Sequence, residues 1–84
     1  MIRKFGAKQL KEITVGNTTT LVSYKTPVVV LVGDALFVTD AKYSKTTTRH
    51  INYYISNHLK MITDINHVDQ SVIYNLAAVT GWAL

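Results

Sequence analysis

Hydrophobic and polar residues alternate along residues 12–15, with a period of two that is typical of a half-buried β-strand. The pair Gly16-Asn17 follows, and both residue types tolerate the positive φ angles of a tight hairpin turn. Residues 18–24 are rich in β-branched and aromatic side chains, which favour strands. The pattern therefore predicts a β-hairpin in which residues 18–24 form the return strand.

The β pattern is interrupted at residues 25–27 and then resumes. Pro27 has no N–H to donate to a neighbouring strand, so it marks a corner or the start of a strand. Residues 28–32 are apolar at every position, which indicates a central strand buried on both faces. A strand of this kind needs apolar cover on both sides of the sheet.

A second turn signal, Gly33-Asp34, separates this strand from residues 35–39. In the strand predicted there, Leu36 and Val38 share one face and Phe37 lies on the other. Because the strands are short and adjacent in sequence, the simplest topology is an antiparallel meander of three or four strands.

In the second half of the chain the hydrophobic spacing becomes that of a helix. Apolar side chains and one histidine recur at intervals of three and four residues, at Ile51, Tyr54, Ile55, His58, Leu59 and Ile62. This stripe predicts an amphipathic helix at about 46–62. Ser44 and the threonine triplet 46–48 offer hydroxyl groups that cap the first turn.

A second helix is predicted after a break at residues 64–67. Asp69 or Ser71 can cap its start, and the helix runs to about Val79. Gly81 is a plausible stop for it. The apolar tail beyond, which contains Trp82 and Leu84, is expected to dock on the rest of the molecule.

These elements predict an α+β fold in one domain over residues 1–84. A sheet at about 10–40 precedes two α-helices at about 46–80, both packed on one face. That arrangement leaves one face of residues 28–32 without cover. The C-terminal tail, an N-terminal segment containing Phe5 and Leu10, or a second subunit can supply it, and the last option favours a homo-oligomer, most simply a dimer.

Composition excludes several classes of protein. Hydrophobic residues make up 48% of the chain and charged residues 17%, which argues against disorder. The absence of cysteine excludes disulfides, thiolate metal sites, iron–sulfur clusters and cysteine nucleophiles. No apolar run approaches the ~20 residues of a membrane helix, and no signal peptide is recognisable. We therefore expect no membrane association and an intracellular location.

The net charge of +4 is unevenly distributed. Residues 1–49 contain eight Lys and Arg against three Asp and Glu, whereas residues 50–84 contain one against two. The positive charge gathers within the first eleven residues and again near residues 42–49. Such an asymmetry permits an anionic partner, either nucleic acid or an acidic protein surface, although it also suits an ordinary solvated surface.

The junction between the last strand and the first helix is the strongest candidate site. A helix N-terminus presents free N–H groups and a partial positive charge, which suit a phosphate or a carboxylate. Arg49 is unfavourable near that dipole, so it either pairs with Asp40 or serves a partner. The alternative interpretation is capping alone, with solvated cations. The candidate partner- or anion-binding residues are Lys42, Tyr43, Lys45, Thr47, Arg49 and His50.

Other chemistries have weaker support. His50 and His58 lie two helical turns apart, too far to share a metal ion, so neither a metal site nor a cofactor is predicted. A small metal-independent hydrolase would use His50 with Arg49 and a tyrosine. Nucleic-acid binding would use exposed tyrosines for stacking, although half-buried structural roles suit these residues too. The tyrosines in question are Tyr24, Tyr43 and Tyr53.

Two blocks of sequence carry a resemblance to small uncharacterised proteins of phages and other mobile elements. The first block is Ser23-Tyr24-Lys25-Thr26-Pro27-Val28, and the second runs from Tyr43 to Asn52 and contains Ser44-Lys45-Thr46-Thr47-Thr48-Arg49-His50-Ile51. The resemblance implies a phage-borne accessory protein in the host cytoplasm. Proteins of that kind include small inhibitors of bacterial defence systems, which act by stoichiometric binding.

The sequence therefore predicts a non-enzymatic protein that binds a host protein or nucleoprotein complex through its basic junction. A nucleic-acid-binding protein using the same junction is the first alternative. The small hydrolase is the second, and a purely structural oligomerisation module is the third.

Overall fold

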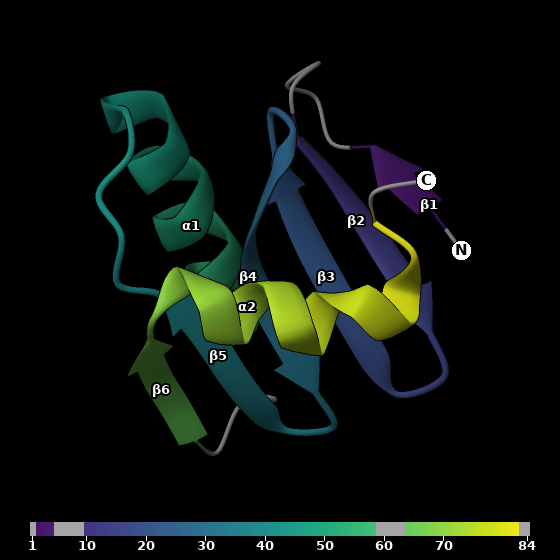
Figure 1. Cartoon of the computed structure of the whole chain (residues 1–84). Helices are drawn as coiled ribbons and strands as arrows, with labels where there is room; N and C mark the ends of the chain where they lie inside the picture. Colours follow the sequence, from purple (N-terminus) through teal and green to yellow (C-terminus); the bar gives the residue numbers. More distant parts are fainter. Residues whose placement is uncertain (1, 5–9, 59–63, 83–84) are drawn as a thin grey trace.

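A mixed sheet with one α-helix over each face makes up the computed structural model, which describes residues 2–4, 10–58 and 64–82, the first segment as backbone only (Figure 1). The strands are β1 (Ile2–Lys4), β2 (Leu10–Val15), β3 (Thr18–Ser23), β4 (Thr26–Val32), β5 (Ala35–Thr39) and β6 (Asp64–Val68). The helices are α1 (Lys45–His58), α2 (Gln70–Ala77) and a short 3₁₀ turn, η1 (Ala78–Thr80). The order of strands in the sheet follows the sequence, from β1 to β6.

The predicted antiparallel meander is confirmed for β2 to β5. Val29 pairs with Val38 and Leu31 with Leu36, so these four side chains share one face of the sheet. Val30 pairs with Phe37 on the opposite face. The all-apolar strand is indeed buried on both faces, as its sequence indicates.

A β-bulge interrupts the pairing of β3 with β4. Val22 pairs with Pro27 and Leu21 with Val29, which leaves Val28 as an extra residue in β4. Val28 consequently joins Val29 in the same buried cluster rather than pointing to the opposite face. The end of the return strand also differs from the prediction, because Tyr24 lies in the β3–β4 turn and β3 ends at Ser23.

The two helices cover opposite faces of the sheet, so the prediction that both pack on one face is wrong (Figure 1). Tyr54 of α1 packs in the cluster that contains Val29 and Leu31. Ile73 of α2 packs instead on Val30, on the other face. The reason is the crossover: α1 connects β5 to β6, and the chain returns to the edge of the sheet before α2 begins.

The edge strand β6 was not predicted, since residues 64–67 were interpreted as a break. β6 pairs in parallel with β5, from Ala35 with Asp64 to Thr39 with Val68. Its side chains are exposed or half-buried, so no alternating hydrophobic pattern marks it in the sequence. The short β1 extends the opposite edge, where Lys4 pairs with Lys11.

Both faces of the central strand are thus covered within one chain. Trp82 packs on the α2 face, where its ring stacks on Tyr74 with 5.5 Å between ring centroids, so the expected docking of the tail is confirmed at this residue. Phe5 and Leu84 lie outside the described residues. The dimer stays a prediction, but uncovered valines no longer argue for it.

The predicted helix signals are largely confirmed. Asp69 caps α2, because its carboxylate accepts a hydrogen bond from the backbone N–H of Ser71 at 3.0 Å. Gly81 ends η1 in the left-handed conformation. The first helix is described to His58, and its predicted continuation to residue 62 lies outside the described residues. Among the described residues, no helix is long and apolar enough to cross a membrane.

Candidate functional site

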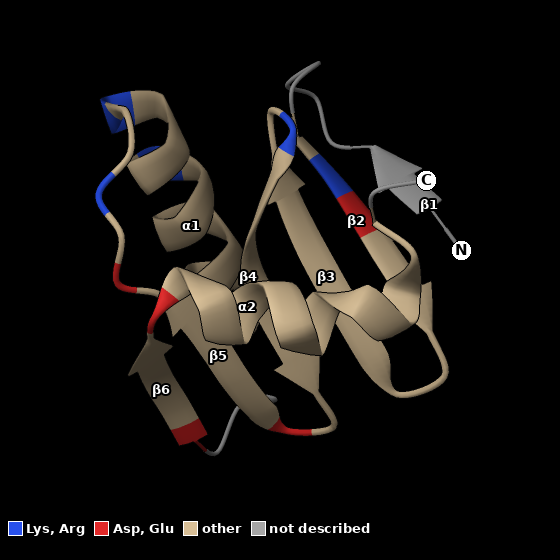
Figure 2. Cartoon of the chain, in the orientation of Figure 1, with Lys and Arg blue, Asp and Glu red and all other residues tan. Residues whose placement is uncertain are grey.

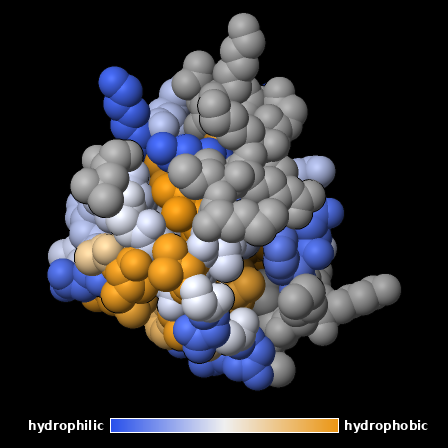
Figure 3. Space-filling model, turned by 90° about the vertical axis from the view of Figure 1, so that its right-hand side faces the viewer, coloured by the Kyte–Doolittle hydropathy of each residue, from blue (hydrophilic) through white to orange (hydrophobic). Residues whose placement is uncertain are grey.

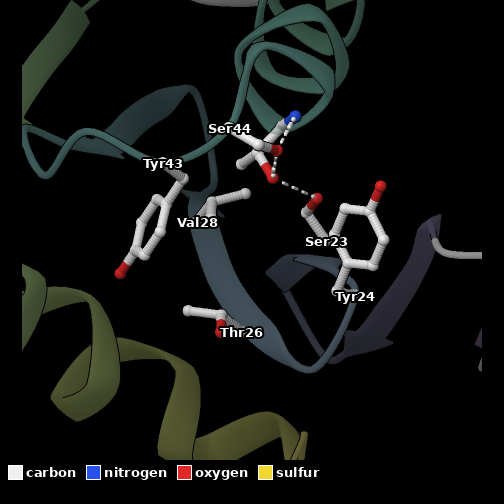
Figure 4. Close-up of a pocket in the computed structure, with 7 residues that line it drawn as sticks. Ser23, Tyr24, Thr26, Val28, Tyr43 and Ser44 are labelled. Atoms are coloured by element: carbon white, nitrogen blue, oxygen red, sulfur yellow. Dashed lines mark hydrogen bonds between the residues drawn. The ribbon is translucent and has the colours of Figure 1, made fainter.

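A pocket of about 260 Å³ lies where the β3–β4 turn meets the start of α1 (Figure 4). Its lining comes from the end of β3, the following turn, the start of β4, and the segment that enters α1. The lining residues are Ser23, Tyr24, Thr26, Val28, Tyr43, Ser44 and Thr47. All of them except Val28 carry a hydroxyl group, and those of Ser23, Tyr43, Ser44 and Thr47 are bonded to neighbouring side chains.

A buried hydrogen-bond network holds α1 against β3 beside this pocket. The Ser23 hydroxyl lies 3.1 Å from Thr47 Oγ1 and 2.9 Å from His50 Nδ1. Ser23 is only 2% exposed, and a buried hydroxyl without partners would carry a desolvation cost. The contacts among these three side chains therefore fix the first two turns of α1 relative to the sheet.

Ser44 caps the N-terminus of α1, as predicted. Its hydroxyl oxygen accepts a hydrogen bond from the backbone N–H of Thr47 at 3.2 Å. Its carbonyl oxygen accepts one from the backbone N–H of Thr48 at 3.1 Å. The side chain of Thr47 is turned inward to Ser23, so the threonine triplet contributes to packing as well as to capping.

Gln70, the first residue of α2, positions the far wall of the pocket. Its side-chain oxygen accepts hydrogen bonds from the Tyr43 hydroxyl at 2.9 Å and from Thr39 Oγ1 at 2.6 Å. Its side-chain nitrogen donates to the carbonyl oxygen of Pro27 at 2.8 Å. Burial, together with nearby Tyr74, raises the pKa of the Tyr43 hydroxyl, so that hydroxyl stays protonated and remains a donor at neutral pH.

Positive charge surrounds this part of the molecule. Lys42, Lys45 and Arg49 are exposed, and within the described part of the chain Arg49 forms no ion pair with Asp40. Lys11 and Lys25 lie at the same end of the sheet (Figure 2). Of the basic N-terminal segment, Lys11 therefore lies at the same end of the sheet as the cations of residues 42–49. The side chains of Arg3, Lys4 and Lys8 lie outside the described residues.

The candidate residues from the sequence fall into two groups. Tyr43 and Thr47 line the pocket, and His50 reaches it through Ser23. The three cations lie on the surface nearby. Sequence reasoning missed Ser23 and Gln70 as positioning residues, and it missed the contributions of Thr26 and Val28 to the lining. The available signal was that Ser23, Thr26 and Val28 all belong to the first of the two sequence blocks singled out above.

Among the three candidate stacking tyrosines, Tyr24 and Tyr43 border the pocket and Tyr53 does not. His58 binds within its own helix: its Nδ1 donates to the carbonyl oxygen of Tyr54 at 2.9 Å, and its ring stacks on that tyrosine with 4.2 Å between centroids. Within residues 10–58 and 64–82, no group of three or more His, Asp or Glu is placed to hold a metal ion.

Comparison with known proteins gives a family but no activity. Neither the curated proteins nor the solved structures contain a significant match to this chain. One family model matches residues 3–70, which include every residue of the pocket and of its hydrogen-bond network. The chain therefore belongs to the family of unknown function DUF8033.

Proposed function

We propose that this protein is a non-catalytic binding protein that engages single-stranded nucleic acid through the basic end of its sheet. We define the basic end as Lys11, Lys25, Lys42, Lys45 and Arg49. The gathering of the described cations carries this proposal. These five residues are all the Lys and Arg whose side chains the structure describes, and they gather at one end (Figure 2). Asp34 and Asp64 lie at the opposite end, whereas Glu12, Asp40 and Asp69 lie toward the same end as the cations, where positive charge still predominates.

A nucleic-acid strand matches this end better than an acidic protein surface does. Tyr24 and Tyr43 are 47% and 40% exposed and border the pocket at the basic end. Proteins that bind single strands without sequence preference combine cations along the backbone with aromatic rings on which bases stack. Of the hydroxyl groups that line the pocket, those of Tyr24 and Thr26 are not bonded to another described residue, and they are suitable donors to phosphate and sugar oxygens.

We assign His50 a positioning role rather than a catalytic one. Its Nδ1 is bonded to Ser23 Oγ, which is itself bonded to Thr47 and buried. This arrangement anchors α1 to β3. A structural role therefore explains the presence of His50, and no catalytic role is needed. Loss of His50 should therefore reduce stability and not abolish a chemical activity.

Stoichiometric binding of a host protein, in the host cytoplasm, is the second candidate function. An exposed apolar surface on a separate side of the molecule favours it (Figure 3). Val15 of β2 and Val79 of η1 are exposed, and these two elements contact each other. Exposed apolar patches of this kind mark protein–protein contacts, and the resemblance to phage accessory proteins points to the same class of partner.

The test is a fluorescence-anisotropy titration with a labelled oligothymidylate of about 15 nucleotides. We expect binding at low salt and an affinity that falls steeply between about 50 and 200 mM salt, because each contacted phosphate releases counterions. Absence of binding at the lowest salt, or an affinity indifferent to salt, contradicts the proposal. A complex with one protein that survives nuclease digestion supports the second candidate instead.

A further inference from the structure

Three two-residue turns connect β2 to β5, and they share one backbone feature. The first residue of each has a positive φ: +60° at Gly16, +60° at Tyr24 and +61° at Gly33. Glycine adopts this conformation freely, whereas a bulky L-residue is strained in it. Tyr24 is the only described residue other than glycine with a positive φ.

The fold itself does not explain a tyrosine in this turn. A glycine would make the same turn without strain, as the other two turns show. Burial does not compensate for the strain, since the Tyr24 side chain is 47% exposed. Its ring lies 6.2 Å from the His50 ring, a tilted contact at the surface. Strained residues of this kind persist at sites where a ligand requires the side chain.

The Tyr24 ring and the Tyr43 ring form two walls of the pocket, and Val28 lies between them (Figure 4). The volume of about 260 Å³ falls below the ~300 Å³ at which small-molecule pockets usually begin, but is far above the ~30 Å³ of one water. The pocket therefore has room for one small group. An aromatic wall on each side and an aliphatic floor suit the faces and edge of a planar group.

We infer that this pocket takes one unstacked base of a single strand, held between Tyr24 and Tyr43. The inference rests on the proposed function and names its base-binding site. The neighbouring lysines suit the phosphates on either side of that base: Lys25 follows Tyr24, and Lys42 precedes Tyr43. Recognition here would use the face of the base, so it would tolerate different sequences.

The decisive variant is Tyr24→Gly, which removes the ring and relieves the backbone strain together. We expect affinity for the labelled oligothymidylate to fall about five- to a hundred-and-fifty-fold, the usual loss for one stacked base. We also expect the melting temperature to rise, which separates lost binding from lost folding. Tyr53→Ala is the matched control, because Tyr53 is exposed but lies outside the pocket, and its affinity should stay within about twofold.

A strand of equal length without bases completes the experiment. We expect the wild-type protein to bind this abasic strand more weakly than oligothymidylate, and Tyr24→Gly to leave that weaker binding unchanged. If the two strands bind equally, or if Tyr24→Gly binds oligothymidylate as the wild type does, the inference fails while the proposed function stands. If neither strand binds the wild type at low salt, the proposed function fails as well.

Discussion

The two ends of the sheet differ in their turn residues and in their charge. At one end, Gly16 and Gly33 make relaxed turns, and Asp34 and Asp64 are exposed (Figure 2). At the other end a turn with the same positive φ contains Tyr24, and positive charge predominates there. Where the turn only has to connect two strands, as at Gly16 and Gly33, glycine occupies the position with positive φ. A tyrosine at the same position indicates that its side chain has a role at the basic end other than making the turn.

Hydrogen bonding differs between the ends in the same way. Near the glycine turns, Gly33 N–H donates to the carbonyl oxygen of Asn17 at 3.0 Å, and the hydroxyls of Thr14 and Thr19 lie 3.0 Å apart on neighbouring strands, so the contacts stay within the sheet. At the basic end, side chains from β3 and α1 meet in the buried contacts of Ser23 with Thr47 and His50. Such contacts fix the geometry of a site, and they explain why the pocket walls are held by several elements at once.

The largest expected effect of a single substitution is that of Ser23→Ala. It leaves the buried groups of Thr47 and His50 without their shared partner, so the free energy of unfolding should fall by about 1–3 kcal/mol. Denaturant unfolding measures this, with Ser56→Ala on the exposed side of α1 as the control. Equal stability of the two variants would show that the network does not anchor the helix.

The double substitution Lys45→Ala with Arg49→Ala tests the charge at the basic end. We expect affinity for oligothymidylate to fall about tenfold at low salt and the salt slope to become shallower by about 1.4, the value for two lost phosphate contacts. Asp34→Ala with Asp64→Ala, at the other end of the sheet, should change neither quantity appreciably. Similar losses from both pairs would remove the distinction between the ends.

Exchanging the turn residues should change stability in opposite directions. Tyr24→Gly should raise the free energy of unfolding by about 1 kcal/mol, since relief of strain exceeds the added flexibility of the unfolded chain. Gly33→Tyr should lower it by a similar amount, because the space around Gly33 is open and only its φ of +61° opposes a side chain. Thermal unfolding measures both, and a destabilised Tyr24→Gly protein would mean that the ring supports the fold.

The smallest expected effect is the pH dependence contributed by Asp69, which does not line the pocket. Hydrogen bonds from the Ser71 hydroxyl and then from its backbone N–H lower the pKa of this carboxyl. Its contribution to stability is therefore present above the unfolded pKa of about 3.9 and is lost as the pH falls through the lower folded value. Asp69→Asn should flatten the stability profile in that acid range and leave oligothymidylate binding unchanged.

Much of the fold follows from local patterns in the sequence. Alternation and the Gly16 and Gly33 turns predict the meander, and Ser44 and Asp69 cap the helices where expected. Helical periodicity identifies which side of a helix is buried, but not which face of the sheet it covers, so the placement of α1 and α2 was not predictable from it. The edge strand β6 was not predictable, because its exposed positions carry no alternating apolar pattern.

The candidate site was predictable only in part, because its contacts join distant segments. The junction was recognised from its own cations and hydroxyls. Its partners are remote in sequence: Ser23 lies 27 residues from His50, and Gln70 lies 43 residues from Pro27. Tyr24 was expected in a strand, since Tyr-Lys is not a typical hairpin pair, and its strained turn becomes visible only in the backbone.

The central claim, that the basic end is the surface that binds a single strand, is tested most directly by amide chemical-shift mapping. Uniformly ¹⁵N-labelled protein would be titrated with unlabelled oligothymidylate at low salt. The account predicts shifts concentrated at residues 24–26 and 43–50, with the amides of Gly16 and Gly33 unmoved. Shifts confined to the apolar surface around Val15 and Val79, or spread evenly over both ends of the sheet, would contradict it.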